Sequence, residues 1–211
     1  MINFNESVFI NCPFDESYQV LQQCMLFTVI TLGYQPRIAS AMDSGEIRLE
    51  MIINLIKESK YSIHDLSRIK SSEEGEYYRL NMPFELGIDF GCRRCTAAEE
   101  YKDKKFLILG EQKYEYMKAL SDISGIDIQY HDNDARKLVK SIRNWFVSNT
   151  DAKNPLDFSK IWYLWSDFCY DYERRQFSRG YSKSELYDIP VKEQIDIIKE
   201  YVEIKSDTLK Q

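Results

Sequence analysis

The chain has 211 residues, five cysteines and a formal net charge of -6. Apolar residues make up 44% and charged residues 29%, a balance typical of folded globular proteins rather than disordered ones. The acidic balance provides no overall basic field, which disfavours a polynucleotide or an anionic membrane surface as a partner.

The cellular location is predicted from three features of the sequence. The odd number of cysteines indicates reduced thiols rather than a disulfide framework. The N-terminus lacks the basic and apolar regions of a secretion signal, and no apolar stretch approaches the roughly 20 residues that cross a bilayer. We therefore expect a soluble cytoplasmic protein that does not enter a membrane.

Short apolar runs alternate with longer helical patterns through the first 150 residues. This alternation predicts an α/β fold with a Rossmann-like or flavodoxin-like parallel sheet of about five strands flanked by helices. The predicted strands are 8–10, 37–39, 61–64, 106–109 and 126–128, and the predicted helices are 17–32, 43–58, 81–91 and 134–147. Gly33 is expected to end the first helix, Asp43 and Glu46 have capping-box spacing, and Asn81 is expected to cap the third helix.

The sequence becomes aromatic and helical from Pro155 onward, with predicted helices at 155–179 and 190–205. We therefore divide the chain into an α/β domain, residues 1–150, and a helical extension, residues 151–211. Large aromatic side chains at helical spacing predict a core or an interface rather than a surface for stacking on bases, and we expect homo-oligomers to form through the extension. These side chains are Trp162, Tyr163, Trp165, Phe168 and Tyr170.

Three polar segments, residues 11–15, 65–68 and 81–87, follow predicted strands or begin a helix. Ligands of doubly wound sheets bind beyond the carboxyl ends of the strands, so we expect these segments to converge on one site. The predicted substrate-binding residues in them are Asn11, Pro13, Phe14, Ser67, Arg68 and Asn81. The connection 67–80 is long for a compact α/β unit, which is typical of a substrate loop or of a mobile insertion.

Two carboxylates are the candidate catalytic groups. Glu85 lies in the first turns of its helix, where an ionised carboxylate is favoured. There it can stabilise or attack an oxocarbenium-like sugar carbon, or it can simply complement the helix N-terminus. Asp65 ends a buried strand, where it can hold ribose hydroxyls or deliver a proton to a leaving base, or serve as a turn residue.

The sequence gives weaker evidence for a catalytic histidine, a phosphate site or a metal site. His64 on a strand is typical of a packed histidine rather than an acid or a ligand, and Arg37 and Arg68 are candidates for phosphate binding or for the solvated surface. Cys92 and Cys95 have the spacing of a metal knuckle, but no second pair completes four ligands, so we expect no metal. No glycine-rich phosphate loop occurs, which disfavours kinases, GTPases and typical dehydrogenases, and we expect no resident cofactor.

The segments Val8–Phe14, Ser59–Leu66 and Phe84–Ile88 resemble the nucleoside 2-deoxyribosyltransferase family and, more loosely, the TIR-like NAD-cleaving domains. The resemblance covers about residues 8–110, and the Glu-Leu-Gly helix is its most specific part. It implies that Glu85 is the nucleophile on the sugar anomeric carbon and that Asp65 helps to bind the nucleoside.

The chain departs from the family pattern at residues 43–46, at the long loop 67–80 and in its helical extension. Relatives with extensions include N-glycosidases of bacterial antiphage systems, which consume nucleotides or NAD. The first hypothesis is therefore an enzyme that breaks the N-glycosidic bond of a nucleoside, nucleotide or NAD, by hydrolysis or by transfer. The alternative is a non-catalytic nucleotide-binding sensor that signals through its extension to a partner.

Overall fold

A five-stranded sheet, entirely parallel, forms the centre of the protein. The computed structural model describes residues 3–42, 47–69, 80–151, 155–183, 185–186 and 188–209, with side chains of the last helix up to residue 205. The strands are β1 (Ser7–Asn11), β2 (Gln35–Arg37), β3 (Tyr61–Asp65), β4 (Lys105–Gly110) and β5 (Ile128–Tyr130). Their order, β2-β1-β3-β4-β5, is the flavodoxin-like order, so the predicted fold class is confirmed.

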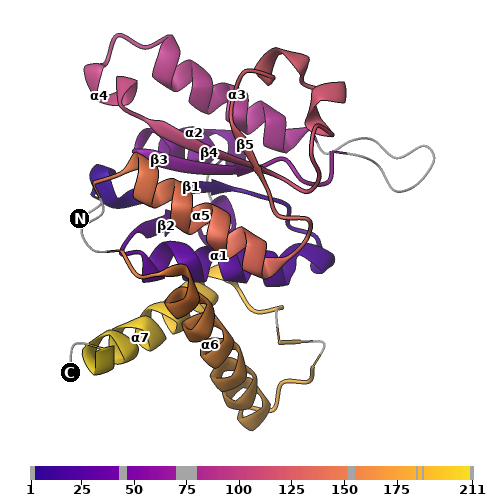
Figure 1. Cartoon of the computed structure of the whole chain (residues 1–211), viewed down its shortest axis with the longest axis vertical. Helices are drawn as coiled ribbons and strands as arrows, with labels where there is room; N and C mark the ends of the chain where they lie inside the picture. Colours follow the sequence, from indigo (N-terminus) through magenta and orange to yellow (C-terminus); the bar gives the residue numbers. More distant parts are fainter. Residues whose placement is uncertain are drawn as a thin grey trace.

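Helices cover both faces of this sheet (Figure 1). One face carries α1 (Gln19–Thr31) and α5 (Ala135–Asn149), and the other carries α2 (Arg48–Lys57) and α3 (Asn81–Arg94), with the short α4 (Glu99–Lys102) after α3. The C-terminal helices α6 (Phe158–Ser178) and α7 (Val191–Leu209) form a further layer outside α1 and α5. Short 3-10 helices occupy Phe4–Glu6, Glu16–Tyr18, Ala39–Ala41, Tyr116–Lys118 and Ser121–Ile123.

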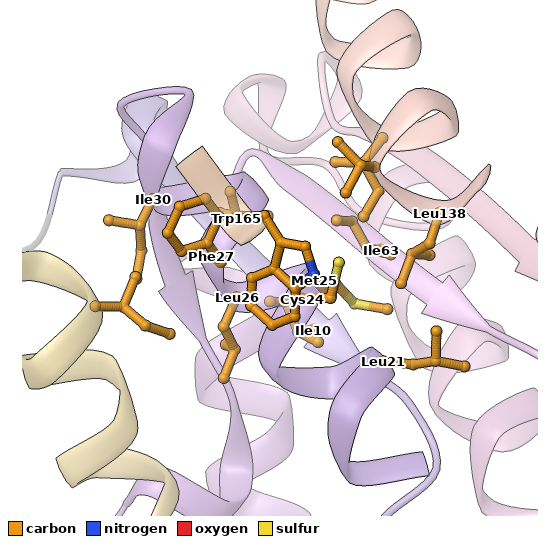
Figure 2. Close-up of a cluster of buried hydrophobic side chains, with 14 of the residues drawn as sticks. Ile10, Leu21, Cys24, Met25, Leu26, Phe27, Ile30, Ile63, Leu138 and Trp165 are labelled. Atoms are coloured by element: carbon orange, nitrogen blue, oxygen red, sulfur yellow. The ribbon is translucent and has the colours of Figure 1, made fainter. Parts of the chain in front are cut away.

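The largest hydrophobic cluster is built around α1. Residues 21–30 of this helix are all buried, because the sheet covers one side of it and the C-terminal helices cover the other. The Phe27 ring lies 5.4 Å from the ring of Trp165 and 6.1 Å from that of Tyr201, measured between centroids. Figure 2 shows Trp165 among the side chains of α1, with Phe27 beside it.

The helical extension thus shares one hydrophobic cluster with the α/β sheet. Trp165 and Phe168 are buried in that cluster, whereas Tyr163 and Tyr170 on the same helix are largely exposed. The predicted homo-oligomer through the extension stays a prediction. No helix in the described part of the chain is long and apolar enough to cross a membrane.

Several predicted element bounds were wrong by two or three residues. The strand predicted at 37–39 lies at 35–37 and includes Pro36, which an edge strand tolerates because its N–H position needs no partner on the open side. The strand predicted at 126–128 lies at 128–130. The third helix continues through Gly91 to Arg94, because Gly91 keeps helical geometry there.

Of the predicted helix ends, the end of the first helix is confirmed and the cap of the third is wrong. Gly33 ends α1 in a left-handed conformation with φ 87°, as predicted. Asn81 is not the cap of α3: it is the first helical residue, and Leu80 occupies the cap position without a side-chain hydrogen bond. The predicted capping box at residues 43–46 and residues 70–79 of the predicted loop lie outside the described residues.

Candidate functional site

The candidate site lies where the order of the strands reverses direction. After β1 the chain crosses to β2 on one side, and after β3 it crosses to β4 on the other. Ligands of flavodoxin-like sheets bind at this switch point, beyond the carboxyl ends of β1 and β3. Asn11 ends β1 and Asp65 ends β3, and the Asn11 amide Nδ2 donates to the backbone oxygen of Met82 in α3 at 2.9 Å. The three predicted segments therefore do meet at this edge.

Asp65 is fully buried and accepts three hydrogen bonds. Its Oδ2 accepts from the Tyr18 hydroxyl and from His131 Nε2, the latter at 3.0 Å, and its Oδ1 accepts from the Ser67 backbone N–H at 2.8 Å. Burial alone would raise the pKa of Asp65, but these donors and the adjacent His131 hold it below its ordinary value. Asp65 is therefore a buried, hydrogen-bonded and ionised carboxylate.

His131 is held in one tautomer by its neighbours. The backbone N–H of Asn133 donates to Nδ1 at 3.1 Å, so Nδ1 carries no proton and Nε2 does. Both Asp65 Oδ2 and the Ser67 hydroxyl lie 3.0 Å from that same Nε2. A catalytic serine triad uses the two ring nitrogens for its two partners, so these three residues do not form one.

Arg68, the residue after Ser67, has a left-handed backbone conformation with φ 66°. Its guanidinium pairs with the Glu111 carboxylate at 2.7 Å, approaches the Asp15 carboxylate at 3.8 Å and donates to the Ser17 hydroxyl at 3.1 Å. Glu111 and Asp15 therefore offset the positive charge that would attract a phosphate to Arg68. Arg37, the other arginine considered for phosphate, is ion-paired with Glu58 at 2.5 Å.

Glu85 lies in the second turn of α3 and is only 9% exposed. Among the described residues no side chain or backbone group forms a hydrogen bond with its carboxyl group. Burial raises its pKa to about 7, although the nearby Arg48 charge acts in the opposite direction. Close to neutral pH this carboxyl group is therefore divided between its acid and its anion.

The surroundings of Glu85 combine charge with apolar surface. The Arg48 guanidinium at the start of α2 lies 5.8 Å from the ring centroid of Phe14, which is 39% exposed. Phe84 is exposed on α3 beside Glu85, whereas Pro13 is buried. Exposed aromatic rings of this kind suit stacking against a planar base.

A second buried polar cluster lies along β3 and beneath α3. His64 Nε2 lies 3.1 Å from Asp89 Oδ2, and the Lys104 ammonium lies 3.2 Å from Asp89 Oδ1, all three side chains being fully buried. The Ser62 hydroxyl also donates to Asp89, and Asn11 Nδ2 lies 3.1 Å from His64 Nδ1. We call this set, Asn11, Ser62, His64, Asp89 and Lys104, the α3 network. The prediction that His64 is packed and hydrogen-bonded is confirmed.

The cysteines do not add a reactive group to this edge. Cys12 is fully buried, and burial raises the pKa of its thiol, so it is not a thiolate nucleophile. Cys92 and Cys95 line a cavity of about 330 Å³ between α2 and α3. No cluster of three or more possible metal ligands occurs among the described residues. A larger cavity of about 530 Å³ opens at the opposite, amino-terminal edge of the sheet, where Gly33 and Lys60 line it.

Sequence reasoning missed four residues of the two buried polar clusters: Tyr18 and His131, which bind Asp65, and Asp89 and Lys104 of the α3 network. His131 directly follows β5, so the rule that placed Asp65 at the end of β3 applies to it as well. Asp89 lies one helical turn beyond Glu85 and so shares its face of α3. For Tyr18 and Lys104 the sequence carries no comparable signal, because their partners are 47 and 15 positions away.

Comparison of the chain with protein-family models, with curated proteins and with solved structures finds no match. The resemblance to nucleoside 2-deoxyribosyltransferases therefore stays a prediction from the residues that carry it. The geometry around Glu85 is the independent basis on which a function can be proposed.

Proposed function

We propose that this protein cleaves the N-glycosidic bond of a nucleoside, a nucleotide or NAD, with Glu85 as the group that captures or stabilises the ribosyl cation. One observation carries the proposal. A buried carboxyl group without a hydrogen-bond partner among the described residues lies at the switch point of the sheet, and its pKa is raised to about 7. Perturbed carboxyl groups at such positions are typical of catalytic sites.

The chemistry suits Glu85 better than the other acidic groups at this edge. Its anion is poorly solvated, so it is stabilised strongly by a positive charge that develops on the anomeric carbon. In the covalent route a Glu85 oxygen bonds to that carbon while the N-glycosidic bond breaks, and its electron pair leaves with the base. A nitrogen base that leaves as an anion takes a proton from water, whereas nicotinamide leaves NAD neutral.

The remaining groups have supporting roles in this proposal. Asp65 is buried and already accepts three hydrogen bonds, so we assign it to holding the loop of Ser67 and Arg68 rather than to attacking the sugar. Phe14 and Phe84 offer exposed rings to the base. We assign Asn81, which is exposed at the start of α3, to binding a polar group of the ligand.

Release of the glycosyl group to water gives hydrolysis, and its capture by a second base gives transfer. The resemblance supports both outcomes, because transferases recycle bases in this way and N-glycosidases of antiphage systems consume nucleotides or NAD. The acceptor present in the reaction decides between them, and a competing free base added to the assay separates the two.

The proposal is tested by incubating the purified protein with a panel of nucleosides, nucleotides and NAD and separating the products by chromatography. We expect a free base from at least one compound with the wild type and none with Glu85→Gln. Glu50→Gln, which changes an exposed glutamate of α2, is the matched control and should behave as the wild type. Binding of one compound without any product, equally in Glu85→Gln, would instead favour the nucleotide sensor.

A further inference from the structure

The α3 network contains charges that a parallel sheet does not need for its own stability. The Lys104 ammonium is fully buried, donates to the backbone oxygens of Ile56, at 2.8 Å, and of Ser59, and pairs with Asp89. Replacing a buried ion pair by packed apolar residues is often neutral or stabilising, so such a pair is weak support for a purely stabilising role. A role in fixing the position of α3 is the alternative.

The hydrogen-bond pattern fixes the orientation of the Asn11 amide and the tautomer of His64. The Met82 carbonyl oxygen can only accept, so the Asn11 side chain must turn its NH₂ group toward it. The second proton of that NH₂ then points at His64 Nδ1, which therefore accepts. His64 consequently carries its proton on Nε2 and donates it to Asp89. One backbone carbonyl thus determines the tautomer of a histidine buried deeper in the protein.

The two ends of the α3 network hold α3 on either side of Glu85. Asn11 binds the helix at Met82, three residues before Glu85, and His64 binds it at Asp89, four residues after. Asn11 and His64 come from adjacent strands and are themselves hydrogen-bonded. Hydrogen bonds therefore hold the segment of α3 that carries Glu85 to β1 at one end and to β3 at the other.

We propose that His64 and Asp89 are positioning residues for Glu85, holding its carboxyl group at the carboxyl ends of β1 and β3. The inference rests on the proposed function, since it assigns these residues to the same site. If these hydrogen bonds to α3 are lost, the helix moves away from the sheet and water reaches Glu85. Displacement of a catalytic group by about 1 Å reduces turnover up to about a hundredfold.

The test compares two substitutions of His64. His64→Leu removes both hydrogen bonds of the ring, whereas His64→Gln retains a side-chain N–H that can donate to Asp89. Tyr172→Phe is the control, because it removes a buried hydrogen bond to the Leu186 carbonyl oxygen, in the extension and remote from α3. The readouts are kcat and KM for base release and the titration of Glu85 followed by carboxyl ¹³C NMR.

We expect His64→Leu to lower kcat about tenfold or more with KM changed less than about threefold. Its Glu85 should titrate below the value of about 7, toward the ordinary 4.5, because water solvates the anion. In His64→Gln, kcat and the pKa of Glu85 should both be close to the wild-type values. Tyr172→Phe should change neither quantity. An unchanged Glu85 titration in His64→Leu would overturn the inference, as would an equal shift in Tyr172→Phe.

Two further measurements test the inference if the first comparison fails. If His64→Leu does not fold, Ser62→Ala removes one donor to Asp89 and should shift the Glu85 titration in the same direction by a smaller amount. No shift there overturns the inference. If no compound of the panel loses its base, the proposed function fails, and the Glu85 titration alone decides whether the α3 network positions this residue.

Discussion

Glu85 and Asp89 lie one turn apart on the same face of α3, yet their environments are opposite. Asp89 pairs with Lys104 and accepts from Ser62 and His64, so its pKa is lowered despite its burial. Glu85 has no hydrogen-bond partner among the described residues, and burial raises its pKa. Two carboxyl groups whose environments push their pKa values apart are the usual sign of divided roles, one structural and one chemical.

The raised pKa of Glu85 predicts that Glu85→Gln stabilises the protein. The folded pKa, about 7, lies above the ordinary 4.5, so the cost of ionising Glu85 develops between these values and is complete above pH 7. We expect the variant to gain up to about 3 kcal/mol in unfolding free energy at about pH 8 and almost nothing at about pH 4. Urea unfolding at both pH values measures the gain. An equal gain at both would contradict the pKa assignment.

The lowered pKa of Asp65 predicts the reverse dependence for Asp65→Asn. The contribution of the ionised carboxylate is present above its ordinary pKa of 3.8 and is lost as the pH falls through the lower folded value. We expect the variant to lose about 2–4 kcal/mol at neutral pH, because its donors lose a charged acceptor. The difference in unfolding free energy between the wild type and Asp65→Asn should become smaller below about pH 4. Asp103→Asn, at an exposed position, is the control for a general charge effect.

Arg48 acts directly on the Glu85 titration. Its positive charge lowers the pKa of Glu85, so Arg48→Met should raise that pKa further above about 7, and Arg48→Lys should largely retain the wild-type value. Carboxyl ¹³C NMR reports the titration. Arg93→Met removes another arginine that lies over an aromatic ring, that of Phe106, and should leave Glu85 unchanged. A downward shift in Arg48→Met would show that the arginine does not act through its charge.

The shared core predicts that the extension and the sheet unfold together. Trp165→Ala should cost about 3–5 kcal/mol, since the indole is buried against Phe27 of α1. Tyr163→Ala, two residues earlier but 67% exposed, should cost less than about 0.5 kcal/mol. Calorimetry should show one transition that moves as a whole. A separate early transition, with the remainder unchanged, would mean that residues 151–211 fold as an independent unit.

Much of the fold could be predicted from the sequence because local patterns determine it. Strands such as β4 appear as short apolar runs, and Gly33 marks the end of α1 by its conformational freedom. The bounds of β2 and β5 were wrong because both strands are at sheet edges, where pairing on one side alone sets their length. Neither apolar periodicity nor turn residues report that pairing.

The candidate site could be predicted only in part. Asn11, Asp65 and Glu85 stand next to strand ends or in a recognisable helix, so their convergence follows from the topology. The partners that decide their chemistry come from distant positions: His131 binds Asp65 across 66 residues and His64 binds Asp89 across 25. For this reason the sequence left Asp65 open between a direct role and a turn residue, and it could not show that the side chain is buried and accepts three hydrogen bonds.

The most direct test of the central claim is the pH dependence of base release by the wild type and by Glu85→Gln, measured on the substrate that the panel identifies. If the Glu85 anion captures or stabilises the ribosyl cation, the wild-type rate rises with pH through about 7 and then levels off. The variant then releases no base at any pH. Base release by Glu85→Gln at the wild-type rate, with the same dependence on pH, would contradict the account.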